Sequence, residues 1–434
     1  MGLTALTAVN PADPHRDARP TRVLLAVTGG NILEWYDFAV YAFLTAVIAK
    51  VMFPLGNATA SLLLSTATFG VGFLTRPVGA LVFGHLADRH GRKFALLLTF
   101  GLMGGSTFAI GVIPPYLAIG LAAPLLVVLA RLVQGFATGG VVGGATAMLT
   151  EHAPPGRAGY FASWQAASQA GALLLGALAA ATVSATLSSA QLDTWGWRVP
   201  FLASVAIVPL ALYFRRRIAD PEAFARQARP AASPLSLLWR THRAAVACGF
   251  GITIIWTVAT YFFYVYVPLF AETVLKLPMA TTLFSNSVAL AFLLVVSPIA
   301  GHLSDRLGRY RIMLAAALAI VVLILPGFHF LLSHPQAVTL GLFQVVFTLL
   351  AALFIGAAPA AMAELFPVGV RSSGVGVAYN FSVTVFGGFA PLIATGLVAR
   401  TNNPISPSWY VISACGLSLM TLLIATRSRV RAQI

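Results

Sequence analysis

Long apolar blocks constrain this chain more than any other feature of its sequence. A helix of about 20 apolar residues crosses the hydrocarbon core of a bilayer, and it satisfies its backbone hydrogen bonds within one segment. With 59% hydrophobic and 9% charged residues, the chain is far from the roughly 25% charged composition of soluble domains. The sequence predicts an all-α integral membrane protein whose twelve transmembrane helices lie at about residues 23–49, 60–83, 94–113, 120–150, 159–187, 197–214, 243–270, 281–301, 311–332, 337–363, 372–399 and 407–426.

The basic residues are distributed unevenly over the connecting segments. The chain carries 27 Lys and Arg against 12 Asp and Glu, a net charge of +15. If the helices alternate in direction, 21 of these 27 fall on the side of both termini and four on the opposite side. Lys and Arg accumulate in cytoplasmic loops of membrane proteins. We therefore expect both termini in the cytoplasm, and we assign the positive charge to topology rather than to a nucleic-acid partner.

The two halves of the chain share a motif. GHLADRHGRK at 84–93 and GHLSDRLGRY at 301–310 are identical at seven of ten positions and lie 217 residues apart. Glu151 and Arg157 follow the fourth predicted helix as Glu364 and Arg371 follow the tenth. A repeat at two places indicates duplication. We expect two six-helix bundles related by pseudo-two-fold symmetry, residues 23–214 and 243–427, joined by a cytoplasmic linker at 215–242, with cytoplasmic tails at 1–22 and 428–434.

The repeated motif predicts a gate on the cytoplasmic side. Asp88 and Asp305 suit the positive N-terminal end of a neighbouring helix or the arginines beside them, and the glycines permit a tight turn. Such contacts can form and break as the halves rock, although the same residues can also anchor a solvated loop. The predicted gating residues are Gly84, Asp88, Arg89, Gly91, Arg92, Asp305, Arg306, Gly308, Arg309, Glu151, Arg157, Glu364 and Arg371.

The repeated motif and the twelve spans resemble the major facilitator superfamily. Narrower motifs are similar to its metabolite–proton symporter family: GNILEWYDF (30–38), GFLTRPVGA (72–80), RLVQGF (131–136), SWQAASQ (163–169), WGWRVPF (195–201) and ELFPVGVRSSG (364–374). Within that family, segments 120–136, 160–169 and 386–395 look most similar to the bacterial citrate and tricarballylate carriers. The resemblance implies a multi-pass transporter of the bacterial inner membrane that uses protons as its coupling ion.

Two acidic residues lie inside the first apolar block. Glu34 and Asp37 share one helix face with Asn31, since residues three apart are neighbours on an α-helix. Ionisable side chains at membrane depth usually face a partner or a transport route. A buried carboxyl group holds its proton more tightly, and a nearby arginine loosens it, so a group that alternates between these surroundings can load and unload a proton. We expect Asp37, and after it Glu34, to carry the coupling proton, although an acid–arginine pair can also serve only to hold helices together.

Two arginines inside the helices of the first half are candidate ligands for an anionic substrate. The planar guanidinium binds a carboxylate with two parallel hydrogen bonds and stays charged at working pH. The helices of this half contain two acidic residues and two arginines, and these equal numbers suggest that the opposite charges are at least partly paired. The C-terminal half has no charge away from its helix ends and offers neutral donors, including Asn286. The candidate substrate-binding residues are Arg76, Arg131, Asn31, Gln165, Gln169, Tyr261, Tyr264, Tyr379 and Asn380.

One position departs from the family pattern. After the RLVQGF segment the resemblance implies an acidic residue in the fourth helix, and this chain has Val141 there. Because this acid is missing, we expect the acidic residues of the first helix to carry the proton.

These features predict a proton-coupled symporter that imports a small di- or tricarboxylate, with citrate or a related tricarboxylate as the first candidate. The alternatives are a 2-oxoglutarate or other dicarboxylate carrier, a zwitterion carrier for betaine or proline, and a drug exporter, which fits the buried arginines less well. The chain stops at Ile434, soon after the last predicted helix, which argues against osmosensing members with long helical tails.

An enzyme is disfavoured, because the sequence has no metal-binding cluster, nucleophile elbow or phosphate-binding loop. Cys248 and Cys415 lie in predicted helices and indicate neither a disulfide nor a metal site. We expect a monomer in contact with lipid, without a cofactor.

Overall fold

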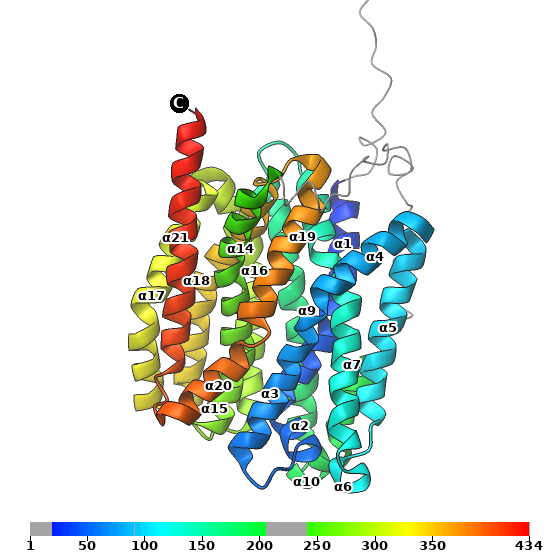
Figure 1. Ribbon diagram of the computed structural model, residues 1–434. Helices are drawn as coiled ribbons and strands as arrows, with labels where there is room; N and C mark the ends of the chain where they lie inside the picture. Colours follow the sequence, from blue (N-terminus) through cyan, green and yellow to red (C-terminus); the bar gives the residue numbers. More distant parts are fainter. Residues whose placement is uncertain (1–19, 91, 205–240, 434) are drawn as a thin grey trace, which may run out of the picture.

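The computed structural model describes residues 20–90, 92–204 and 241–433. Most of the predicted N-terminal tail, the sixth helix beyond Ser204 and nearly all of the predicted linker at 215–242 lie outside the described residues. Within these ranges all regular structure is helical, and Figure 1 shows the long helices running side by side as one bundle.

The N-terminal half supplies five described long spans and the start of a sixth. The first span bends by 66° between Trp35–Phe43 and Thr45–Met52. Three short helices lie between the spans: α6 Tyr116–Ile119, α10 Ser189–Gln191 and η2 Leu192–Gly196. The long helices are α1 Pro20–Phe43 with α2 Thr45–Met52, α3 Ala58–Leu74 with α4 Arg76–His90, α5 Arg92–Val112, α7 Ala122–Thr138 with α8 Val141–Glu151, and α9 Ala158–Thr186.

The C-terminal half supplies six spans, two of which contain a π-helical segment. The spans are α14 Arg243–Val258 with η3 Ala259–Tyr266 and α15 Val267–Thr273, α16 Met279–Leu307, α17 Arg309–Ser333, α18 Ala337–Ala363, η4 Val368–Val370 with α19 Arg371–Ser382, η5 Val383–Gly387 and α20 Ala390–Thr401, and α21 Pro407–Gln433. η3 and η5 are the π-helical segments.

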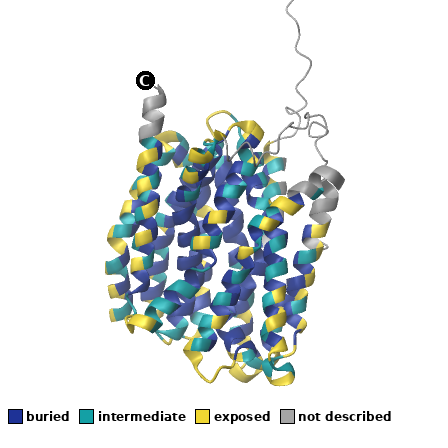
Figure 2. Ribbon diagram, viewed as in Figure 1, coloured by how far each residue is buried: buried dark blue, intermediate teal, exposed yellow. Residues whose placement is uncertain are grey.

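The described helices confirm the predicted membrane architecture. Nine of them are long and apolar enough to cross a bilayer, and the bent first span brings the number to ten. The third predicted span corresponds to a shorter apolar helix, Gly101–Val112. Large apolar side chains such as Leu318, Val322 and Leu342 are exposed on the outside of the bundle. Figure 2 shows buried residues gathered in the interior and exposed residues on the surface. An apolar exterior of this kind suits contact with lipid.

The two halves approach most closely along α9 and α16. A Cβ atom added at Gly159 of α9 would lie 2.5 Å from the carbonyl oxygen of Gly301 in α16, and one added at Gly301 would lie 2.5 Å from the carbonyl oxygen of Gly159. Small residues let membrane helices pack backbone to backbone. Only glycine fits at this crossing while the halves keep the arrangement seen here.

Charged contacts join the halves at the end of the bundle where the C terminus lies (Figure 1). Asp305 of α16 accepts hydrogen bonds from the backbone N–H groups of Gly159, at 2.7 Å, and Tyr160, at 3.0 Å, at the start of α9. An anion at a helix N-terminus is stabilised by the helix dipole. Arg309 contacts both Asp305, at 3.1 Å, and Glu364.

An ion pair crosses between the halves at the same end. Arg371 of α19 lies 3.2 Å from Glu151 of α8. The side chains of Arg157 and Arg306 are exposed, and Gly308 has a φ of +93°, which favours glycine between α16 and α17. In the first copy of the motif, the side chains of Asp88, Arg89 and Arg92, the surroundings of Gly84 and the whole of Gly91 lie outside the described residues. The gating role of both copies stays a prediction.

Gly159→Val should disfavour the observed arrangement, because the added side chain overlaps the backbone of α16 at a cost of about 1–3 kcal/mol. Disulfide crosslinking between Glu151→Cys and Arg371→Cys should fall in this variant. Gly416→Val is the matched control, since nothing lies within 4 Å of a Cβ atom at Gly416. Equal crosslinking in both variants would contradict the packing assigned to Gly159.

Candidate functional site

Two guanidinium groups are buried inside the N-terminal half. Arg76 is the first residue of α4 and is 2% exposed, and Arg131 lies in the middle of α7 and is 0% exposed. Their central carbons lie 4.5 and 4.6 Å from the centre of the Phe38 ring of α1. Their separation therefore cannot exceed the sum of these two distances. Two positive charges are held close together in an apolar interior.

Aromatic rings surround both guanidinium groups. Besides Phe38, Arg76 lies over Phe73 at 4.2 Å and Trp35 at 5.2 Å, and Arg131 lies over Tyr41 at 4.6 Å and Phe69 at 5.1 Å. Cation–π contacts of this kind each contribute about 0.5–2 kcal/mol, more when desolvated. The rings partly offset the cost of burying the charges while leaving N–H groups without acceptors. We call these five rings the aromatic cage: Trp35, Phe38, Tyr41, Phe69 and Phe73.

Hydrogen bonds orient Arg131. Its Nη1 donates to the side-chain oxygen of Gln134 at 2.8 Å, and its Nη2 donates to the backbone oxygen of Phe69 at 3.3 Å. The Nε atoms of Arg76 and Arg131 are buried and have no hydrogen-bond partner among the described residues. A buried donor left without an acceptor is costly. An anion that enters this site can supply the acceptors.

The expected pairing between Asp37 and the arginines is absent in this arrangement. Asp37 lies on α1 and is 6% exposed, and no described N···O contact within 4 Å joins it to Arg76 or Arg131. Thr107 of α5 and Arg131 of α7 are among the polar residues around it. The guanidiniums lie over aromatic faces instead of against the carboxylate. The side chain of Glu34 lies outside the described residues.

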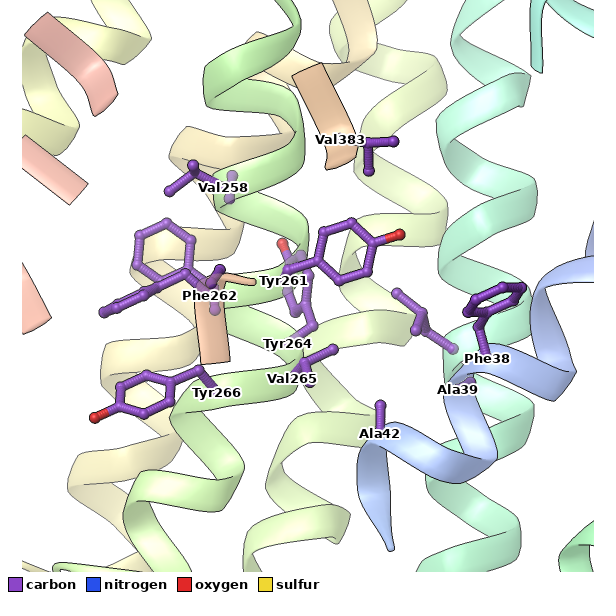
Figure 3. Close-up of a cluster of buried hydrophobic side chains, with 14 of the residues drawn as sticks. Phe38, Ala39, Ala42, Val258, Tyr261, Phe262, Tyr264, Val265, Tyr266 and Val383 are labelled. Carbon is purple, nitrogen blue, oxygen red and sulfur yellow. The ribbon is translucent and has the colours of Figure 1, made fainter. Parts of the chain in front are cut away.

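Tyr261 brings the C-terminal half into the site. Its ring packs 5.3 Å from that of Phe73, 6.0 Å from Phe69 and 6.4 Å from Trp35. Its hydroxyl is buried without a hydrogen-bond partner among the described residues. Figure 3 shows the Tyr261 ring directed from η3 toward Phe38, whereas Tyr266 points to the other side. Tyr261 therefore closes the aromatic cage from the partner half.

The expectation that Tyr261 and Tyr264 share a face is wrong. Residues 259–266 form a π-helix, whose wider turn separates side chains three residues apart. Tyr264 lies beside Thr348 of α18, away from the arginines. Pro268 has no N–H to give the Tyr264 carbonyl four residues earlier, and the side-chain amide of Asn286 donates to that oxygen at 3.0 Å. Asn286 thus supports the backbone of the π-helix.

The predicted amide ligands divide into two groups. The amide nitrogen of Asn31 donates to Ser168 Oγ at 2.7 Å and so ties α1 to α9. Asn380 donates to the backbone oxygen of Gly139 at 2.7 Å, which ties α19 to the N-terminal half. Both amides therefore act here as links between helices. The other group is Gln165 and Gln169, with Tyr379 beside them.

Gln165 and Gln169 lie one helical turn apart on α9, and both are buried. Both side-chain amide atoms of Gln165 are buried without a partner among the described residues. Gln169 accepts a hydrogen bond from the Trp256 indole at 3.3 Å, and the Trp256 ring packs 5.1 Å from that of Tyr379. Gln165 retains the free donors and acceptor that a polar ligand requires.

A narrow crevice, too tight in this arrangement to hold a ligand, lies next to Arg76; its lining residues are Trp35, Phe38, Arg76, Thr138, Val141 and Val142. Val141 therefore faces the crevice at the position where the family resemblance implies an acid. Valine brings no charge to offset Arg76. Aromatic walls and the Arg76 guanidinium meet in this crevice, and no carboxylate of a described side chain lies within 4 Å of that guanidinium.

Sequence reasoning missed the aromatic cage, Thr107 and Gln134. A spacing signal existed, because Trp35, Phe38 and Tyr41 recur every three residues, and Gln134 follows Arg131 by three. Such spacing is also typical of ordinary core packing, so only the structure shows that these side chains face the arginines.

Phe38→Leu should lower stability by about 1–3 kcal/mol, because it removes the ring that both guanidiniums contact. The measurement is the thermal unfolding midpoint of the purified protein in detergent. Phe108→Leu is the matched control, since Phe108 is 44% exposed on the outer face of α5. A midpoint for Phe38→Leu equal to that of the control would show that the ring contacts contribute little.

Comparison with known proteins agrees with this architecture. Residues 29–391 match the family described as Major Facilitator Superfamily. The chain is 37% identical to a citrate-proton symporter of Salmonella typhi, with 94% of each chain covered, and 31% identical to the proline/betaine transporter of Escherichia coli K12, over 93% of this chain and 83% of that protein.

Solved structures show the same fold. The proton:xylose symporter XylE superposes with a TM-score of 0.74 at 16% identity, covering 94% of this chain and 95% of that one. With its predominantly apolar helices, the protein is a multi-pass inner-membrane transporter rather than an enzyme, and it belongs to the Major Facilitator Superfamily.

Proposed function

We propose that the protein is a proton-coupled symporter that imports a small di- or tricarboxylate, with citrate or a related tricarboxylate as the first candidate. The observation that carries this proposal is the pair Arg76 and Arg131, buried together without a carboxylate partner within 4 Å among the described residues. The similarity to citrate-proton symporters supports the same substrate class.

Two guanidiniums suit a substrate with at least two carboxylates. Each guanidinium can form two parallel hydrogen bonds with one carboxylate, and the aromatic cage excludes water that would screen them. In this proposal Arg76 and Arg131 hold the acid groups. Gln165, Gln169, Tyr261 and Tyr379 supply neutral hydrogen bonds from around the centre of the bundle.

A zwitterion carrier is the second candidate, because proline/betaine transporters are also among the relatives. A zwitterion has a single carboxylate and a cationic group, so it would leave one guanidinium without an acceptor and place positive charge beside it. The charge of the described site therefore favours the polycarboxylate.

Co-transported protons make anion import feasible. The membrane potential opposes entry by about 2.3 kcal/mol per net negative charge per 100 mV. Asp37 is our proposed proton carrier, because it is buried next to Arg131 without being paired to it. Glu34 is the second proposed carrier. We place both termini in the cytoplasm, where the contacts of Asp305, Arg309, Glu364, Arg371 and Glu151 would form the inner gate.

Citrate and tricarballylate should raise the thermal unfolding midpoint of the purified protein more than 2-oxoglutarate, succinate or betaine at equal concentration. Arg76→Gln should weaken citrate binding roughly 10- to 150-fold, because a charged hydrogen-bonding group is worth about 1.5–3 kcal/mol. Arg400→Gln is the control, since Arg400 is exposed at the end of α20. Stabilisation by betaine alone would refute the carboxylate assignment.

Asp37→Asn should abolish citrate accumulation driven by a pH gradient in proteoliposomes while leaving citrate exchange across the membrane measurable. The neutral amide cannot carry a proton, but it keeps the size of the side chain. Asp193→Asn in η2, outside the described site, is the control. Undiminished accumulation by Asp37→Asn would remove Asp37 from the proton route.

A further inference from the structure

The backbone carbonyl of Phe73 is held by a side chain of the C-terminal half. Pro77 of α4 lies four residues after Phe73 and has no N–H to donate to its carbonyl oxygen, as a helix would require. The backbone N–H of Thr75 points to this oxygen, and the Thr384 hydroxyl of η5 donates to it at 2.9 Å. The same hydroxyl lies 2.7 Å from the backbone oxygen of Asn380 in its own span, so its single proton has one acceptor in each half.

Two adjacent glycines of the C-terminal half make room for aromatic rings. A Cβ atom added at Gly388, directly after η5, would lie 2.5 Å from the Phe73 ring, and one added at Gly387 would lie 2.7 Å from the Tyr261 ring. Carbon atoms pack at about 3.5–4.0 Å, so any larger residue at either position would displace a ring. The two rings meet edge to face, with their centres 5.3 Å apart. The glycine pair therefore fits the pair of rings.

Phe73 connects this contact to Arg76. The central carbon of Arg76 lies 4.2 Å from the centre of the Phe73 ring, closer than the 4.5 Å to Phe38 and the 5.2 Å to Trp35. Phe73 itself is fully buried. Both the carbonyl and the ring of the residue that covers Arg76 thus contact the C-terminal half. A movement that withdraws Thr384 and Gly388 would release that ring.

The closed arrangement leaves no space for a substrate beside Arg76. The crevice there is too tight to hold a ligand, and no described carboxylate lies within 4 Å of the guanidinium. A buried charge without compensation is costly. Among the described groups, the rings of Phe73, Phe38 and Trp35 lie over this charge. They stand where an anionic substrate would otherwise compensate Arg76.

We propose that Thr384 and the Gly387–Gly388 pair hold Phe73 over Arg76, and Tyr261 against Phe73, while the carrier passes through its closed form without substrate. The proposal rests on the proposed function, since a carrier that alternates access must return once per cycle without its substrate. Thr384 and the two glycines are positioning residues that act through the rings. The rings stabilise the closed form that excludes the anion, and they thereby lower the barrier of the return step.

Thr384→Val tests the contact with Phe73, because it removes the hydroxyl and keeps the branched shape; Thr384→Ser restores the hydroxyl. Proteoliposomes loaded with labelled citrate are diluted at equal pH into buffer with or without unlabelled citrate. Efflux into citrate-free buffer requires the carrier to return without substrate, whereas exchange does not. The ratio of exchange to efflux is the readout, since a variant that merely folds poorly lowers both rates.

Thr384→Val should slow efflux about two- to tenfold, the effect of one hydrogen bond, and leave exchange within about twofold of wild type. Thr384→Ser should restore efflux. Thr182→Val is the matched control, because Thr182 is exposed and its hydroxyl donates to the Leu178 carbonyl of its own helix.

Gly388→Ala is the second variant, because its methyl group would lie where the Phe73 ring now packs. It should also slow efflux more than exchange. Gly396→Ala in α20 is its control, since a Cβ atom there would lie 3.9 Å from the Leu63 side chain, an ordinary contact. The citrate dissociation constant, measured by calorimetry, should stay equal or fall in Thr384→Val and Gly388→Ala, because destabilising a form that excludes citrate favours binding.

The outcomes separate this proposal from the proposed function. An exchange-to-efflux ratio equal to wild type in both Thr384→Val and Gly388→Ala would overturn the proposal and leave the carboxylate function standing. A raised citrate dissociation constant in both variants would also overturn it, since these residues would then serve substrate binding. A wild-type protein that exchanges no citrate would remove the proposed function and this proposal together. Slower efflux with preserved exchange, and its recovery in Thr384→Ser, supports the proposal.

Discussion

The burial of two guanidinium groups among aromatic rings is the constraint on which the rest of the site depends. An isolated charge in an apolar interior is costly, and here no described carboxylate within 4 Å pairs with Arg76 or Arg131. The ring faces and the hydrogen bonds to Gln134 and Phe69 recover part of that cost. In the function proposed above, the anionic substrate offsets the remainder.

The proposed substrate site lies where the two halves meet. Tyr261 of the C-terminal half closes the aromatic cage of the N-terminal half, while Asp305 and Arg371 connect the halves at one end of the bundle. The Gly159–Gly301 crossing brings the backbones together in the same arrangement. A movement that separates these contacts would also separate Tyr261 from the rings of the N-terminal half, which is the movement that the proposed gate requires.

Much of the fold could be predicted from the sequence, since a bilayer allows few solutions. The long apolar blocks predicted the position of every span that the structure describes. The repeat at 84–93 and 301–310 predicted that the chain consists of two halves. The buried positions of Arg76, Arg131 and Asp37 followed from charges placed inside apolar blocks. The sequence did not reveal that Tyr261 and Tyr264 point to different sides of their helix, because the spacing of apolar residues cannot distinguish a π-helix from an α-helix.

The sequence by itself determined the membrane architecture and which charges must be buried, because hydrocarbon thickness and the cost of desolvation act on any chain of this composition. Only the tertiary structure decided which groups those charges meet. Asp37 was an expected partner of the arginines, yet Arg131 contacts Gln134 and three aromatic rings of neighbouring helices instead. Helix rotation and crossing set these contacts, and both depend on side chains distant in the sequence.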